Sequence, residues 1–236
     1  MMKWVVTVMV MVVGLLHPFT GHCVTESALA CAIDSWTNGA RWFECGSPDG
    51  REDRAREYAK LILKSSARYG HDPLVLAGII EQESGFDRCQ IGRPSRRSAQ
   101  LPLHPTREQV LQAFGSIQAR RKARVTRVDA GPAQFLWPYG SAFSATEGVT
   151  LDKVLDLAWS LDTLGWTLDR HRELALKRGS VTHGFHRLPP DDTYWTRHNT
   201  GSGFSPRYYS NVTRRVRRLS AKTEDCERGF LTKSGG

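Results

Sequence analysis

The 236-residue sequence predicts a mainly α-helical protein. Several stretches carry apolar residues three and four positions apart, which is the spacing of an amphipathic helix. Runs with the two-residue alternation of a half-buried strand are almost absent. An apolar share of 40% and a charged share of 24% are typical of a globular chain and exclude a largely disordered one.

The first predicted element is an export signal over residues 1–22. Lys3 precedes an apolar run at residues 4–16. This run is shorter than the roughly 20 apolar residues that a membrane-spanning helix needs, and it suits a secretory signal peptide. An uncleaved signal anchor is the alternative interpretation. Cleavage between residues 21 and 30 would give an exported protein, periplasmic or extracellular, with no stable membrane span.

A Cys-containing segment over residues 23–50 follows, and it either caps the core or forms a loosely attached arm. Cleavage after Ala30 would leave four of the five cysteines, whereas cleavage near residue 22 would leave all five. No pair has the C-x-x-C spacing of a zinc site, so we expect no metal and no cofactor. In an exported protein the cysteines are expected to form structural disulfides, with the pairing open. They are Cys23, Cys31, Cys45, Cys89 and Cys226.

Residues 51–222 are predicted to form one helical domain. An amphipathic stretch at 51–69 predicts the first helix, which Gly70 ends. The second helix has the clearest signals in the chain. Asp72 is a predicted N-cap, Pro73 occupies the first helical position, and Gly85 follows the end.

Three further helices complete this domain. Thr106 and Gln109 predict a capping box for a helix whose apolar stripe ends at Ile117. Thr150 is expected to begin a long helix that continues to about Gly179. Residues 180–204 are rich in glycine and proline and are predicted to be loop. The last helix is expected to run from 205 to 222, with residues 223–236 as a C-terminal tail.

Glu83 occupies an unusual position on the second helix. It follows Ile79 and Ile80 by four and three residues, which places it on the apolar stripe at the C-terminal end. Burial and the helix dipole both disfavour a carboxylate there, and a raised pKa is what a general acid requires. The alternative is a last-turn glutamate that reaches solvent. Glu81 points roughly 200° around the helix and cannot share the same site.

Four segments together resemble the lytic transglycosylases of the goose-lysozyme-like kind. Residues 69–86 resemble the opening of their catalytic domain, where a helix ends in a catalytic Glu-Ser, here Glu83-Ser84. The sequence GPAQF at 131–135 is similar to the Gly-x-x-Gln segment of the family. His-Asn-Thr-Gly at 198–201 stands where the family often has Tyr-Asn-Ala-Gly, and residues 208–212 are similar to its Tyr-Val-x-x-Val helix. The long 83–131 segment and GPAQF are more similar to the membrane-bound B-type enzymes.

This resemblance implies a lysozyme-like helical domain with a cleft, and an activity on peptidoglycan. Such enzymes cleave the β-1,4 bond between N-acetylmuramic acid and N-acetylglucosamine and leave a 1,6-anhydro ring. Glu83 would be the catalytic acid and then the base, with Tyr208 hydrogen-bonded beside it. Gln134 and Asn199 would contact the sugars or their N-acetyl groups, with a loop-stabilising hydrogen bond as the alternative for each. Ser84 and His198 complete the substrate-binding set, and the exchange of Tyr for His198 puts any role of that ring in question.

Trp137 follows GPAQF directly and offers an apolar ring face to a sugar. An ordinary core tryptophan is an equal alternative at this position.

Two other functions remain open. A goose-type hydrolase would need a carboxylate to activate water, and Asp87 is the first candidate. The other alternative is a protein that binds the cell wall, or acts as an adaptor in a secretion apparatus, and that has kept the fold without the catalytic activity. The small size suits an enzyme that opens the wall locally for a secretion or conjugation machine.

The net charge of +9 indicates an anionic partner. Basic runs lie at 120–127 and 214–218, but export and the lack of a recognition-helix motif argue against nucleic acid. The expected partner is therefore the carboxylate-bearing cell wall, where the enzyme would bind the glycan strands of peptidoglycan.

Overall fold

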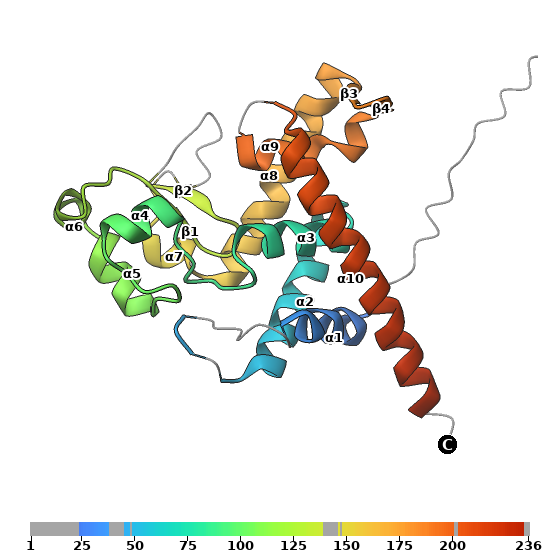
Figure 1. The fold of residues 1–236 in the computed structure, drawn as a ribbon, viewed down its shortest axis with the longest axis horizontal. Helices are drawn as coiled ribbons and strands as arrows, with labels where there is room; N and C mark the ends of the chain where they lie inside the picture. The colour runs from blue at the N-terminus through green and yellow to red at the C-terminus, as the bar shows by residue number, and fades with distance from the viewer. Residues whose placement is uncertain are drawn as a thin grey trace, which may run out of the picture.

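The computed structural model describes residues 24–37, 45–47, 49–138, 146, 148–200 and 203–233. Within these ranges the protein is mainly helical with two short β-hairpins (Figure 1), which confirms the predicted α class. The predicted signal segment 1–22 and Cys23 lie outside the described residues. No helix in the described part is both long and apolar enough to cross a membrane.

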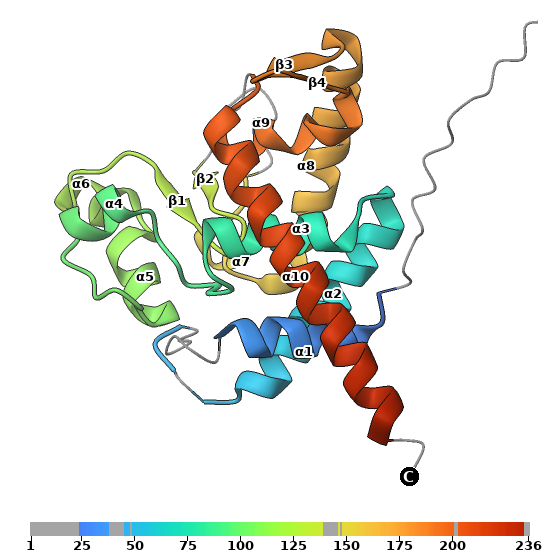
Figure 2. The same ribbon diagram turned by 45° about the vertical axis from the view of Figure 1, so that its right-hand side comes forward.

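The centre of the fold is α3 (Pro73–Glu83), which packs between α2 (Arg51–Tyr69) and α10 (Pro206–Lys233). Leu76, Ile79 and Ile80 on α3 have almost no exposed surface. The long helix α8 (Leu157–Arg178) packs against α2 on another side. Figure 2 shows α10 passing across α3 and then across α1 (Glu26–Thr37).

Gly78 explains why α3 and α10 lie so close together. A Cβ atom at this position would lie 2.9 Å from Val216 Cγ2 and 3.5 Å from the Val216 backbone nitrogen. Only a residue without a side chain fits this contact unchanged. The close contact brings the start of α10 to the C-terminal end of α3, where Glu83 lies.

The described part of the 23–50 segment packs on the core, as its capping alternative expects, whereas α10 continues through residues 223–233, which were predicted to be tail. Helix α1 packs on α2 and α10, with Leu29 and Ile33 fully buried. The Cys31–Cys226 disulfide joins α1 to a part of α10 that was expected to be tail. Cleavage after Ala30 would remove part of this core helix, so cleavage near residue 22 is the alternative that preserves the packing.

The helix boundaries with local signals agree with the prediction. Gly70 ends α2 in the left-handed region, with φ 68°. The Asp72 carboxylate accepts a hydrogen bond from the Leu74 N–H at 2.7 Å, and Pro73 starts α3. Thr106 and Gln109 form both hydrogen bonds of a capping box at the start of α5 (Arg107–Phe114).

Two predicted helices are shorter than expected. Helix α5 ends at Phe114, and Ile117 starts the separate helix α6 (Ile117–Lys122) with 58% of its surface exposed. Thr150 caps only the short helix α7 (Leu151–Val154). Helix α8 then starts afresh because the Asp156 side chain accepts a hydrogen bond from the Trp159 N–H and caps it.

The remaining elements are short. Strands β1 (Val128–Ala130) and β2 (Phe135–Trp137) form a hairpin around the GPAQF turn, and α4 (Arg93–Ser98) precedes them. The stretch predicted as loop contains a second hairpin, β3 (Val181–His183) and β4 (His186–Leu188). The short helices η1 (Pro190–Asp192), η2 (Tyr194–Thr196) and α9 (Arg197–Thr200) follow it. The second hairpin has little apolar alternation because its strands are half-buried or exposed.

Candidate active site around Glu83

Glu83 lies at the last position of α3, at the end of the apolar stripe. The residue is half-buried, and its Oε1 atom is buried without a hydrogen-bond partner among the described residues. Burial raises the pKa of the Glu83 carboxyl group, and the nearby Asp129 carboxylate raises it further. Interactions with His198, Tyr208 and Arg215 oppose this rise. The net effect favours a carboxyl group that retains its proton to a higher pH than usual.

Tyr208 on α10 provides the phenol beside Glu83. Its side chain is buried, and its Oη atom has no hydrogen bond of standard geometry within the described residues. Burial and the neighbouring Glu83 carboxylate raise the pKa of Tyr208 well above its usual value, so the phenol remains a proton donor. Tyr209 instead stacks on Trp195, with ring centroids 5.4 Å apart. Of the two adjacent tyrosines, Tyr208 is therefore the one that faces Glu83.

His198 on α9 joins this site to the turn between β1 and β2. Its Nε2 atom donates a hydrogen bond to the Ala133 carbonyl at 2.7 Å, which identifies the nitrogen that carries the proton. Its ring also meets Phe135 edge-on, with centroids 5.7 Å apart. The charges of Glu83 and Asp129 both interact with His198. The imidazole therefore lies between the helix end and the hairpin.

Gln134 stabilises the β1–β2 turn. Its Nε2 atom donates to the carbonyls of Gln90 and Gly131, both at 2.9 Å. Both amide hydrogens therefore have backbone partners, which agrees with the loop-stabilising alternative and leaves only Oε1 for a sugar. The turn itself needs glycine at 131, where φ is 81° and a Cβ would lie 2.6 Å from the Val154 carbonyl oxygen.

Trp137 does not belong to the Glu83 site. The side chain is buried, and its Nε1 atom donates to the Val149 carbonyl at 2.8 Å. The Arg120 guanidinium lies over the indole ring, 4.5 Å from its centroid. Because the ring is enclosed in this way, the sugar-stacking interpretation of Trp137 is replaced by that of a core residue.

Ser84 has a structural contact at the end of α3, whereas Asn199 stays available for the sugar contact that the family resemblance implies. The Ser84 hydroxyl donates a hydrogen bond to the Ile80 carbonyl at 3.1 Å, which gives a backbone carbonyl at the C-terminal end of α3 a partner. Asn199 is exposed on α9 and remains accessible to a ligand.

Asp129 is the site residue that sequence reasoning missed. It lies on β1, two residues before the Gly131 turn, and it keeps exposed surface. Partial burial of the carboxyl group raises the pKa of Asp129, and the nearby His198 opposes this rise. The available signal was its position beside GPAQF, but no local pattern shows that β1 approaches the end of α3.

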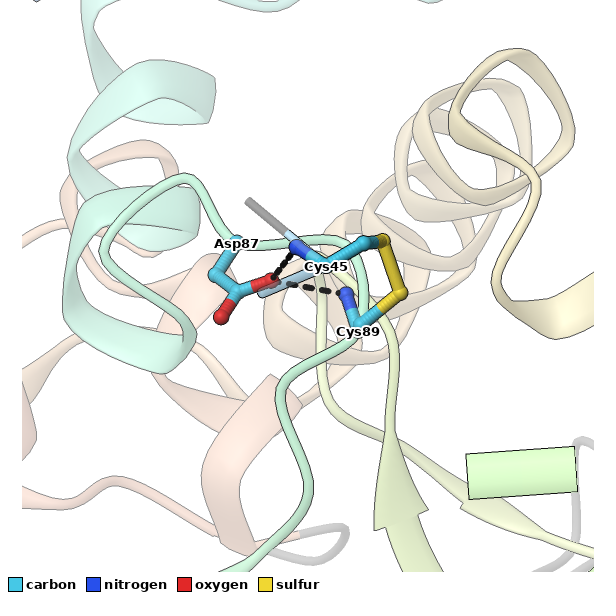
Figure 3. Close-up of side chains that lie close together, drawn as sticks. All are labelled: Cys45, Asp87 and Cys89. Carbon is cyan, nitrogen blue, oxygen red and sulfur yellow. Dashed lines mark hydrogen bonds between the residues drawn. A yellow bond between two sulfur atoms is a disulfide. The ribbon is translucent and has the colours of Figure 1, made fainter. Parts of the chain in front are cut away.

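Asp87, the sequence candidate for a second catalytic carboxylate, has a structural role instead. Its Oδ1 atom accepts hydrogen bonds from the backbone N–H groups of Cys45 at 3.1 Å and Cys89 at 2.9 Å (Figure 3). Its Oδ2 atom lies 3.4 Å from His104 Nδ1. Because the side chain is buried and both oxygens are engaged, Asp87 is poorly placed to activate water.

The Cys45–Cys89 disulfide forms part of the same cluster. Cys45, Asp87 and Cys89 place potential ligand atoms within 4.8 Å of one another, and no other described residues form such a group. Both sulfurs are bonded to each other, so this cluster offers no thiolate to a metal.

Glu81 lies in a separate environment, as its angle around the helix predicts. It is buried and forms ion pairs with Arg215, at 2.9 Å, and with Arg218. Burial raises the pKa of Glu81, and the two arginines oppose the rise. Because Arg215 also acts on Glu83 and Tyr208, this ion cluster connects the α3–α10 contact to the candidate site.

Comparisons of the chain with protein-family models, with curated proteins and with solved structures gave no match.

Proposed function

We propose that the protein is a peptidoglycan lytic transglycosylase with Glu83 as its catalytic residue. The observation that carries this proposal is a half-buried carboxyl group at the end of an apolar helix, with a buried phenol beside it. A carboxyl group with a raised pKa can donate a proton near neutral pH and afterwards accept one. The motif resemblance around Glu83-Ser84 supplies the substrate class.

In the proposed reaction, Glu83 protonates the glycosidic oxygen of the departing N-acetylglucosamine. As that bond breaks, the C6 hydroxyl of N-acetylmuramic acid attacks C1 of the same sugar. The Glu83 carboxylate takes the hydroxyl proton, and the 1,6-anhydro ring closes. One C–O bond breaks and one forms, Glu83 is regenerated, and no water is consumed.

The neighbouring groups have consistent roles in this scheme. The Tyr208 phenol stabilises the carboxylate that Glu83 becomes after the first proton transfer. His198 holds the β1–β2 turn against the helix end through its bond to Ala133. Among the described residues, the exposed Asn199 and the Oε1 atom of Gln134 would contact N-acetyl sugars.

Charge and disulfides support the cell wall as the place of action. Two disulfides are typical of a protein in an oxidising compartment, which agrees with export. The net charge of +9 would attract a polymer that carries carboxylates. A small enzyme of this kind would open the wall locally for a secretion or conjugation machine.

A hydrolase of the goose-lysozyme type is the second candidate, and Asp129 is the observation that favours it. Its carboxylate acts on Glu83 and shares the His198 neighbour. Two carboxyl groups can divide the work, one donating the proton and the other activating water or stabilising the sugar cation. Asp129 thus replaces Asp87 as the candidate second carboxylate.

Digestion of purified peptidoglycan tests both candidates when the products are resolved by mass. Anhydro-muramyl ends from the wild type, absent with Glu83→Gln, would support the transglycosylase. Reducing ends that disappear in both Glu83→Gln and Asp129→Asn would favour the hydrolase. Equal cleavage by the wild type and Glu83→Gln would refute the role of Glu83. Binding without cleavage by the wild type would indicate the adaptor function.

A further inference from the structure

A groove of about 750 Å³ lies at the opposite end of α3 from Glu83. Pro73, Leu74 and Val75 from the first turn of α3 line it, together with α10 residues such as Val216. Since α3 rises about 1.5 Å per residue, this end lies roughly 15 Å along the helix from Glu83. None of Glu83, Asp129, His198 and Tyr208 lines the groove among the described residues. It is therefore a surface separate from the candidate active site.

The floor of the groove is apolar and aromatic. Leu74, Val75 and Val216 are only partly buried by the rest of the core, and Trp195 and Tyr209 contribute the aromatic part. The stacked rings of Trp195 and Tyr209 hold this wall in place. An occupant of this floor would need apolar side chains.

The rim has the opposite charge from the protein as a whole. Five carboxylates line the groove in the described part of the chain, whereas the net charge of the protein is +9. They are Asp72, Asp191, Asp192, Glu224 and Glu227. The single lining guanidinium, Arg172, is already bonded to the carbonyls of Tyr69 and Gly70 and to Asp169. Asp169 already pairs with this guanidinium, so carboxylates outnumber cations among the described residues that line the groove.

We propose that this groove docks a segment of a partner protein in which lysine or arginine side chains stand beside apolar ones. The apolar floor would take the apolar side chains, and the carboxylates would pair with the cations at the rim. The same carboxylates would repel the acidic groups of peptidoglycan, so the groove does not suit the glycan substrate. The enzyme could thus hold a partner on one face of α10 and its substrate at the other end of α3.

Fluorescence anisotropy with two labelled probes tests this proposal. One is a short amphipathic peptide of leucine and lysine, and the other has glutamate in place of lysine. The wild-type chain should bind the lysine peptide only, more weakly at high salt. Asp191→Asn with Glu224→Gln should weaken binding about five- to tenfold, as expected for the loss of two exposed ion pairs. Asp53→Asn with Glu57→Gln is the matched control, because both residues are exposed on α2 and outside the groove.

Four results would overturn the proposal. The first is that the lysine peptide does not bind, and the second is that both peptides bind equally well. The third is that the groove and control variants weaken binding equally. The fourth is that high salt does not weaken binding of the lysine peptide. Self-association that the groove substitutions abolish would assign the groove to a second copy. Binding only by a chain that lacks residues 1–22 would assign it to the segment that precedes Val24, which lines the groove. Peptidoglycan cleavage is measured separately, so this result is independent of the proposed activity.

Discussion

Substitution of Gly78 by alanine should destabilise the protein, although alanine is the better helix former. In an open helix this change stabilises by roughly 1 kcal/mol. Here the added Cβ would lie 2.9 Å from Val216 Cγ2, and the Val216 backbone nitrogen lies behind it at 3.5 Å. A β-branched side chain in a helix has one strongly preferred rotamer, so Val216 cannot turn away and α10 must shift. Overpacking costs about 1–3 kcal/mol, so we expect a net loss of about 1 kcal/mol.

Urea unfolding and peptidoglycan cleavage measure the two consequences of Gly78→Ala. The midpoint should fall, and cleavage should slow because the shift of α10 moves Tyr208 away from Glu83. Gly229→Ala is the matched control, since a Cβ there meets nothing within 4 Å and should not destabilise. Adding Val216→Ala to Gly78→Ala should relieve the clash, with a coupling of about 1–3 kcal/mol. A Gly78→Ala protein that is more stable and equally active would refute this reasoning.

Three further predictions concern the site, the disulfide and the pH dependence. Tyr208→Phe should slow peptidoglycan cleavage by about tenfold or more, because a hydrogen bond to a charged group contributes about 1.5–3 kcal/mol. Tyr209→Phe is the control and should have little effect. Equal cleavage rates for the two variants would contradict the assignment of Tyr208. Cys31→Ser with Cys226→Ser removes a disulfide between residues 195 positions apart. The free energy of unfolding, measured in urea, should fall by about 2–5 kcal/mol. An unchanged urea midpoint would show that α1 and α10 stay together without the disulfide. Burial lowers the pKa of His171 from 6.5 to about 3, so the neutral ring contributes stability above pH 6.5 that is lost as the pH falls toward 3. His171→Gln should flatten this loss in urea midpoints measured across that range, and an unchanged slope would exclude His171 as its source.

Local signals in the sequence predict the helix ends well. Asp72, Pro73 and the Thr106–Gln109 box act within a few residues, so their structural effect is readable without tertiary contacts. The sequence does not indicate that the helix starting at Thr150 ends before α8, because apolar residues continue on both sides of Asp156. An N-cap residue inside an apolar stripe has no distinctive sequence pattern. The hairpin at 181–188 was missed because its exposed strands lack alternation.

The candidate site depends on contacts between distant parts of the chain. The place of Glu83 on the apolar stripe follows from helical spacing, but its neighbours do not. Asp129 reaches the site through a hairpin, and Tyr208 reaches it through the contact of α10 with Gly78. Asp87 was the nearer candidate in sequence, yet the Cys45–Cys89 disulfide and the backbone turn it inward. Nearness in sequence was therefore a poor guide to the second carboxylate.

The proposed acid catalysis requires that burial at the end of α3 keeps the Glu83 carboxyl group protonated above pH 4.5, the ordinary glutamate pKa. A pH titration by NMR with ¹³C-labelled glutamate carboxyl groups tests it directly, and the Glu83→Gln variant identifies the resonance. We predict that the Glu83 signal titrates above pH 4.5 in the wild type. A Glu83 signal that titrates at or below pH 4.5 would contradict the assignment of this residue as a general acid.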